Sequence, residues 1–368
     1  MAVRIIVLVL YFAVLLAIGV YTSKMAKSYS EYNLAARSNN KWIAGISTQS
    51  SSTSGWMLLA MPGLAFTYGF GVIWTLIGWM GGSLFNWLVL AKRLRLATET
   101  YDSVSIVEYF EKRTGDEKGI VGLISGISII VLMIINSSGE LIGCGKLIQS
   151  AFGLDINTAT TIGLVIVVIY TFLGGYMAVS WSNLLQGALM FIALLIVPIY
   201  AVINYGGFHD IAADAIQYDP DMFSFLSDEM TLQEKVVLVS GGVGIGFMYP
   251  GMVHALTGLM AIKDPKEVKD SALIATIWGC AALGGAILPD IADPEQTFLV
   301  LSEKYFNNAL FALMAAAVMA AILSSVCAYL IVATASLGGS VVKRFFRIED
   351  DHKVVMIEKI AMVVIALV

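Results

Sequence analysis

The chain has 368 residues, of which 58% are hydrophobic and 13% charged, and its formal net charge is −5. A soluble domain carries about 25% charged residues, so this composition excludes a large soluble helical protein. The small net charge gives no support for a nucleic-acid partner. Three widely spaced cysteines and three histidines predict neither a disulfide framework nor a metalloenzyme centre.

Long apolar segments recur along the whole chain. A helix needs about 20 mostly apolar residues to cross a bilayer. Segments of this kind lie at 3–22, 43–68, 72–91, 119–148, 157–176, 183–204, 236–260, 271–289, 307–338 and 354–368. We therefore predict an all-α polytopic membrane protein with the lipid bilayer as its surroundings.

Both ends of the chain lie in apolar segments. The first segment is interpreted as a retained helix and not a signal peptide, because no convincing small-residue cleavage site precedes Lys24. The last segment is still apolar at residue 368, so we interpret the chain as a fragment of a longer protein.

Lys and Arg are unevenly distributed between the loops. One alternating set of loops, at 23–42, 92–118, 261–270 and 339–353, holds most of them. The other set holds only Arg4, Lys146, Lys235 and Lys304. Because cytoplasmic loops are rich in Lys and Arg, the N-terminus is expected outside a cell (inner) membrane.

Two segments are interrupted at matching places. Residues 48–56 read TQSSSTSGW inside an apolar stretch, and residues 240–251 combine several glycines with Pro250. The two interruptions lie five segments apart, a pattern typical of transporters built from inverted repeats, with the binding site at the breaks. The alternative for residues 240–251 is glycine placed for close helix packing.

Hydroxyl groups are concentrated in the first interruption, where Ser50 to Ser54 carry five in succession. Carbonyl and hydroxyl oxygens at a helix break suit a hard monovalent cation, since they replace its hydration shell without a fixed charge. A second pair, Ser324–Ser325, lies in the centre of segment 307–338. The alternative is that these hydroxyls bond back to their own helix.

Glu140 lies late in segment 119–148, where an apolar residue is expected. An ionisable group at membrane depth is a candidate functional residue. We hypothesise that Glu140 faces a central cavity and either pairs with a cationic or amino group of a solute or carries protons. The alternatives are an ion pair with Lys146 or a position at the outer interface.

Several stretches together resemble the solute:sodium symporter family, and in particular its sodium/proline branch. They are Ser30–Arg37, Ser54–Gly55–Trp56 with Met61–Pro62–Gly63, Asn86–Trp87, Ala91–Arg95, Tyr170–Trp181, Tyr249 with His254, and Ala321–Ser325. The resemblance implies a LeuT-like fold in a single transporter domain, 1–368, with five-plus-five inverted repeats. The leading helix would be 3–22, repeat one about 43–204, and a truncated repeat two about 236–368.

The resemblance also implies a sodium site, with sodium as coupling ion and no other cofactor. Its ligands would be the carbonyl groups of Ser50, Thr53 and Ala321 and the hydroxyl groups of Ser324 and Ser325. For the solute, the positions at the two breaks together with the membrane carboxylate nominate Gln49, Trp56, Met57, Glu140 and Tyr249.

Three positions depart from the family's pattern. The proline branch has aspartate where this chain has Ser52, and many members have aspartate where it has Asn183. Neutral Asn183 argues against a second sodium ion. After Tyr249 the proline branch reads Gly-Gln-Pro-His, whereas residues 251–254 here read Gly-Met-Val-His, so proline does not follow as the solute.

The sequence therefore favours sodium-coupled symport of a small organic solute, an amino acid or related compound, by alternating access. Proton-coupled symport through Glu140 and a solute-sensing domain of a signalling protein stay open as alternatives. A membrane enzyme is disfavoured because no nucleophile–base or metal constellation appears. A channel is disfavoured because no charged ring or filter repeat appears.

Overall fold

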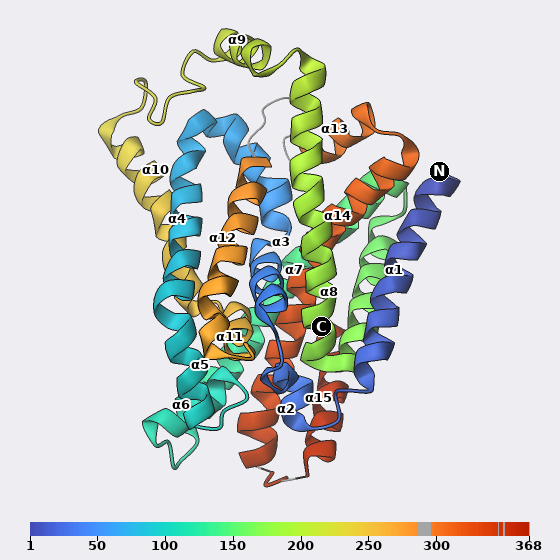
Figure 1. Ribbon diagram of the computed structural model, residues 1–368, viewed down its shortest axis with the longest axis vertical. Coiled ribbons are helices and arrows are strands. Elements are labelled where there is room, and N and C mark those ends of the chain that lie inside the picture. The colour runs from blue at the N-terminus through green and yellow to red at the C-terminus, as the bar shows by residue number, and fades with distance from the viewer. Residues whose placement is uncertain (286–295, 345, 349, 368) are drawn as a thin grey trace.

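The chain is helical through nearly all of the residues that the computed structural model describes, which are 1–285, 296–344, 346–348 and 350–367 (Figure 1). The long helices are α1 (Ala2–Ser23), α3 (Lys41–Tyr68), α4 (Ile73–Phe85), α7 (Ile120–Phe152), α8 (Ile156–Tyr205), α12 (Val268–Gly285), α14 (Asn308–Leu337) and α15 (Asp351–Ala366). Shorter helices are α2 (Tyr29–Leu34), α5 (Ala91–Thr100), α6 (Ile106–Thr114), α9 (Phe208–Tyr218), α10 (Leu232–Gly244), α11 (Val253–Met260) and α13 (Thr297–Tyr305). Within these ranges the only strand-like pairing is an isolated bridge between Asn39 and Ile262.

The predicted apolar segments are all occupied by helices, as far as they are described. Residues 286–289 of segment 271–289, and residue 368 of the last segment, lie outside the described residues. By length and hydropathy alone, five continuous helical stretches of the described chain can cross a membrane, or six with the bent pair α10–α11. Two of these stretches, Lys41–Thr100 and Ile156–Tyr205, are long enough to cross twice.

The longest helical stretch, α8, is divided at Gly175. This residue has φ +57° and ψ −147°, and a Cβ there would lie 2.3 Å from the Tyr32 carbonyl oxygen. Glycine therefore allows both the backbone turn and the close approach of α2. The turn separates the two predicted segments 157–176 and 183–204, which run in opposite directions in Figure 1.

Both predicted interruptions are present, although the first is narrower than expected. In α3 only Ser54 leaves helical geometry, with φ +54° and ψ +176°, so the hydroxyl strip stays helical as far as Thr53. The second interruption is a 3-10 turn, Ile245–Gly251, between α10 and α11, whose axes differ by 50°. α3 and the α10–α11 pair run in opposite directions, as inverted repeats require (Figure 1).

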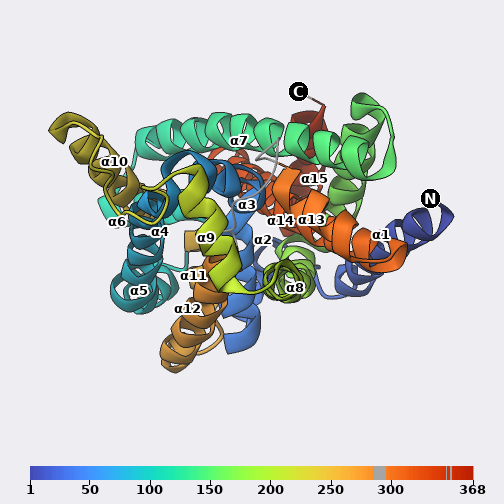
Figure 2. The same cartoon turned by 90° about the horizontal axis from the view of Figure 1, so that it is seen from above.

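α14 forms the centre of the molecule. From Phe311 to Ser336 almost every residue is buried, and α14 packs against α7, α8, α3 and α1. Figure 2 shows α14 between α7 and α8. Alanine at 315–317, 320 and 321 lets neighbouring helices approach closely, which is how helices pack in a membrane. The predicted serine pair thus lies on the most enclosed helix.

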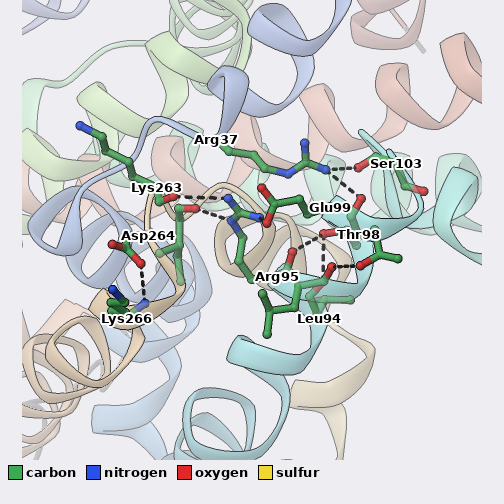
Figure 3. Close-up of polar contacts among 12 residues, drawn as sticks. Arg37, Leu94, Arg95, Thr98, Glu99, Ser103, Lys263, Asp264 and Lys266 are labelled. Atoms are coloured by element: carbon green, nitrogen blue, oxygen red, sulfur yellow. Dashed lines mark hydrogen bonds and ion pairs between the residues drawn. The ribbon is translucent and has the colours of Figure 1, made fainter.

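The basic loops all lie at one end of the molecule, around α2, α5 and α6 and the start of α15, opposite α9 (Figure 1). Two arginines join the loops there (Figure 3). Arg37 donates to the carbonyl groups of Thr98 and Ser103, at 3.0 and 2.8 Å. Arg95 donates to the carbonyl group of Ile262 and forms an ion pair with Glu99 at 2.8 Å.

Candidate functional site

The hydroxyl groups of α14 meet the backbone of α3 one turn before its break. The Ser324 hydroxyl lies 3.2 Å from the Ser50 carbonyl oxygen and 2.9 Å from that of Ala321. The Ser325 hydroxyl donates to the Ser51 carbonyl at 2.9 Å. All of these residues except Ser51, which is 3% exposed, have no exposed surface. Hydroxyl and carbonyl oxygens from two segments distant in the sequence therefore lie together at one buried point.

The donor set fits a sodium ion. It consists of uncharged carbonyl and hydroxyl oxygens, which are hard ligands suited to a monovalent cation. Four of the five predicted ligands, Ser50, Ala321, Ser324 and Ser325, are joined by these hydrogen bonds. Thr53 is also buried, but its hydroxyl donates to the Gln49 carbonyl of its own helix at 2.8 Å. Its carbonyl therefore stays a predicted ligand.

The sequence alone did not identify Ser51 or Asn183 as parts of this cluster. Asn183 lies on α8, where its backbone carbonyl accepts from the Ser50 hydroxyl at 3.1 Å and its amide donates to the Ser324 carbonyl at 3.3 Å. It therefore braces both serine groups without adding charge. Its place among the family's variable acidic positions was the only sign of this role. For Ser51 no sign was available, because the contact uses a backbone oxygen.

A cavity of about 650 Å³ opens beside the break of α3. Both interruptions contribute to its wall, since α3 and the 3-10 turn before α11 each supply residues. Two of the predicted solute-binding residues line it, Trp56 and Glu140. The rest of the wall includes the hydroxyl, aromatic and thioether groups of Ser52, Trp79, Met252 and Tyr329, together with aliphatic side chains and Lys146. A pocket of this size and composition suits a small organic molecule.

Glu140 closes the break of α3 from the side. Its Oε2 accepts a hydrogen bond from the backbone N–H of Gly55 at 3.0 Å, immediately after Ser54. A Cβ on Gly55 would lie 3.0 Å from the same oxygen and 2.7 Å from Ile322. Glycine is thus needed for this contact. Glu140 lines the cavity, while its role toward a solute stays a prediction.

Gln49, Met57 and Tyr249 lie behind the cavity wall, outside its lining. The Tyr249 ring meets Trp79 edge-on, with centroids 5.7 Å apart, and Met57 packs into the same apolar cluster. The Gln49 Oε1 accepts from the Ser83 hydroxyl at 3.1 Å. The Gln49 side chain also interacts with the Tyr249 hydroxyl. None of these three residues lines the cavity, although Gln49 contacts its wall at Thr53, whose hydroxyl donates to the Gln49 carbonyl.

The fold defines a class of proteins. A solved Na+-coupled sialic acid symporter, in a substrate-bound outward-open state, aligns with 99% of this chain and 80% of its own, with a TM-score of 0.81 and 19% identity. The architecture is therefore the LeuT-like fold, with inverted repeats after a leading helix. The predicted fold is confirmed.

Sequence comparison narrows the class to a family. The sequence profile of the sodium:solute symporter family matches residues 32–368. The osmoregulated proline transporter OpuE of Bacillus subtilis (strain 168) is 31% identical over 98% of this chain and 75% of its own. A sodium/proline symporter of Staphylococcus aureus (strain bovine RF122 / ET3-1) is 34% identical over 99% of this chain and 73% of its own. The chain belongs to the sodium:solute symporter family.

Membership confirms the predicted kind of activity. The protein is a multi-pass membrane transporter that couples movement of a solute to sodium, and it is not an enzyme. Sodium as coupling ion, and not a bound organic cofactor, agrees with the neutral oxygen cluster on α3 and α14.

Proposed function

We propose that this protein carries an amino acid or a related nitrogen compound into the cell together with sodium, by alternating access at the two interrupted helices. The observation that carries the proposal is the convergence of the Ser324 and Ser325 hydroxyls on the Ser50 and Ser51 carbonyls beside the cavity. Two relatives are named as proline transporters, which supports a small amino compound as the solute.

The proposed sodium ligands are the carbonyl groups of Ser50, Thr53 and Ala321 and the hydroxyl groups of Ser324 and Ser325. Each hydroxyl now donates to a carbonyl, and rotation about its C–O bond would instead turn a lone pair toward an ion. Because no carboxylate takes part, the ion is held by dipoles alone and is released more readily than from a charged cage. Reversible binding is what transport requires.

Coupling follows from the position of the site between two elements. The ligands come from α3 and α14, so an ion bound by both stabilises the arrangement in which these helices are close. Such coupling requires that the ion bind the two conformations with different affinity. The solute would bind in the adjoining cavity, in contact with Trp56 and Glu140. We propose that Gln49, Met57 and Tyr249, which lie outside the lining of the cavity, come into contact with the solute when the helices move.

The proposed orientation has the basic loops around α2, α5 and α6 in the cytoplasm and the N-terminus outside, since positive loops stay inside. A sodium ion then enters down its gradient and with the membrane potential. That potential is worth about 2.3 kcal/mol per charge for every 100 mV. Protease cleavage of an N-terminal tag in right-side-out vesicles tests the orientation, and protection of the tag would contradict it.

The test of the ion site uses proteoliposomes and radiolabelled sodium. Ser324→Ala with Ser325→Ala should reduce sodium-dependent binding and uptake at least tenfold, because two ligands are lost. Ser336→Ala is the matched control, since its buried hydroxyl donates to Val332 within α14 at 2.8 Å. Unchanged sodium dependence in the double variant, or an equal loss in the control, would contradict the proposal.

A further inference from the structure

The second half of α3 begins with its first amide groups already occupied. The Gly55 N–H donates to the Glu140 carboxylate at 3.0 Å, and the Trp56 N–H donates to the Ser54 hydroxyl at 3.2 Å. The N-terminus of a helix attracts negative charge, because its free N–H groups and the helix dipole act together. In transporters with broken helices, this position receives the anionic group of the solute. Here the chain's own Glu140 occupies it.

The surroundings of Glu140 favour a cation. Trp56, Trp79 and Tyr329 line the same cavity, from α3, α4 and α14. Aromatic faces beside a carboxylate are the groups that recognise an ammonium ion in proteins. Ser52 and Asn136 add neutral polar groups to the wall. An ammonium compound of modest size would therefore find both its charge and its alkyl groups matched.

Lys146 also lines the cavity, and its positive charge would repel a cationic solute. It lies six residues beyond Glu140 on α7, which places it about 9 Å further along the helix axis. It is exposed, whereas Glu140 is half-buried at the break. The field at the Gly55 amide is therefore set mainly by the nearer carboxylate.

We propose that Glu140 determines the solute class by filling the anion position of the broken α3, so that the cavity takes a small organic ammonium compound without a free carboxylate. The inference rests on the proposed function and specifies the solute of that same site. A zwitterionic amino acid would have to displace Glu140 from the Gly55 amide or place its carboxylate against another carboxylate. Either arrangement weakens its binding.

Two matched pairs of probes separate the carboxylate from everything else. Choline and glycine betaine share a trimethylammonium group, and prolinol and proline share a pyrrolidinium ring. In each pair a hydroxymethyl group replaces a carboxylate. The full chain is reconstituted in proteoliposomes, and binding of each probe is measured in sodium and in potassium. At least one hydroxymethyl compound should bind in sodium at least tenfold more tightly than its carboxylate partner.

The variant Glu140→Gln tests the residue itself. Glutamine retains an oxygen that can accept from the Gly55 N–H and nearly the same volume, but it removes the charge. The ratio of affinities for the hydroxymethyl compound and its carboxylate partner should fall at least tenfold. The ammonium alcohol should bind more weakly and the zwitterion more tightly. Glu303→Gln is the control, because Glu303, on α13, is exposed and forms an ion pair with Arg4 of α1 away from the cavity. Its preference should equal that of the unaltered protein.

Sodium binding and the serine variants test the proposed function separately from the solute preference. Failure of this inference can therefore be told apart from failure of the proposed function. Preference for proline or glycine betaine in the unaltered protein would overturn the inference while leaving sodium symport intact. A preference unchanged by Glu140→Gln, or no binding of any of the four probes while sodium still binds, would overturn it as well. Loss of sodium binding itself would instead contradict the proposed function.

Discussion

Asn33 provides the hydrogen bond on which a buried carboxylate of α15 depends. Its Nδ2 donates to the Glu358 Oε2 at 2.8 Å, joining α2 to α15 at the end that carries the basic loops. Glu358 is fully buried and Asn33 is 1% exposed. The second carboxylate oxygen, Oε1, has no hydrogen-bond partner among the described residues. Asn33→Ala would therefore leave both oxygens without one.

The expected loss of stability comes from a buried group left without its hydrogen bond. A buried acceptor that loses its donor costs about 1–3 kcal/mol. We expect Asn33→Ala to lower the free energy of unfolding by about 2 kcal/mol. In a Glu358→Leu background the same change should cost less than about 0.5 kcal/mol, because no carboxyl oxygen is then left unpaired. The coupling energy between the two sites is then about 1.5 kcal/mol.

The assay is unfolding by sodium dodecyl sulfate in mixed micelles, applied to the four proteins of this double-mutant cycle. Asn204→Ala is the control, because that exposed amide donates only to the Tyr200 carbonyl of its own helix, at 2.8 Å. It should change stability by less than about 0.5 kcal/mol. A coupling energy below about 0.5 kcal/mol would refute the reasoning, since it would mean that Asn33 and Glu358 act independently.

Three further predictions concern the same end of the molecule. Gly338→Ala should lower the melting temperature, because its Cβ would overlap the buried Glu358 carboxyl group and force that side chain to move, whereas Gly139→Ala, in open space, should be neutral in the same thermal scan. Arg95→Lys should destabilise by about 1.5–3 kcal/mol, since lysine cannot reproduce the guanidinium fork, and exposed Arg93→Lys should not, both read by micellar unfolding. At Asp116, desolvation raises the pKa but backbone N–H groups of α7 outweigh it and hold the pKa below 3.8, so Asp116→Asn should lower the melting temperature at neutral pH, with the difference vanishing as pH falls through that lowered pKa.

Much of the architecture could be predicted because hydrophobic length and charge distribution act locally along the chain. The apolar segments, the grouping of basic loops and the two interruptions all follow from such local patterns. The extent of the first interruption did not follow from the local pattern. Five successive hydroxyl residues predicted an unwound stretch, but four of them stay helical, and their hydroxyls are satisfied by carbonyls of their own or a neighbouring helix. Only Ser54 leaves the helix.

The site was predictable to the same degree. The chemistry of oxygen ligands in a membrane pointed to the hydroxyl strip and to Ser324–Ser325, and the family resemblance singled out Ser50 within the strip. The structure brings these distant segments into contact. The Ser51 carbonyl was missed because backbone oxygens are present at every residue and carry no mark in the sequence. Gln49 and Tyr249 were nominated from their places at the breaks, yet neither lines the cavity, because helix rotation decides which face of a helix meets it.

By itself, the sequence determined that this chain is a helical membrane protein with two interrupted helices, a hydroxyl strip, and a carboxylate, Glu140, late in segment 119–148. These features depend on the free energy of placing each residue type in hydrocarbon, which is a property of the residue. Only the tertiary structure decided that Glu140 lies against the Gly55 amide, and not at the outer interface or in an ion pair with Lys146. That contact needs two helices at a particular rotation and depth, which are set by packing against α14 and by no local pattern.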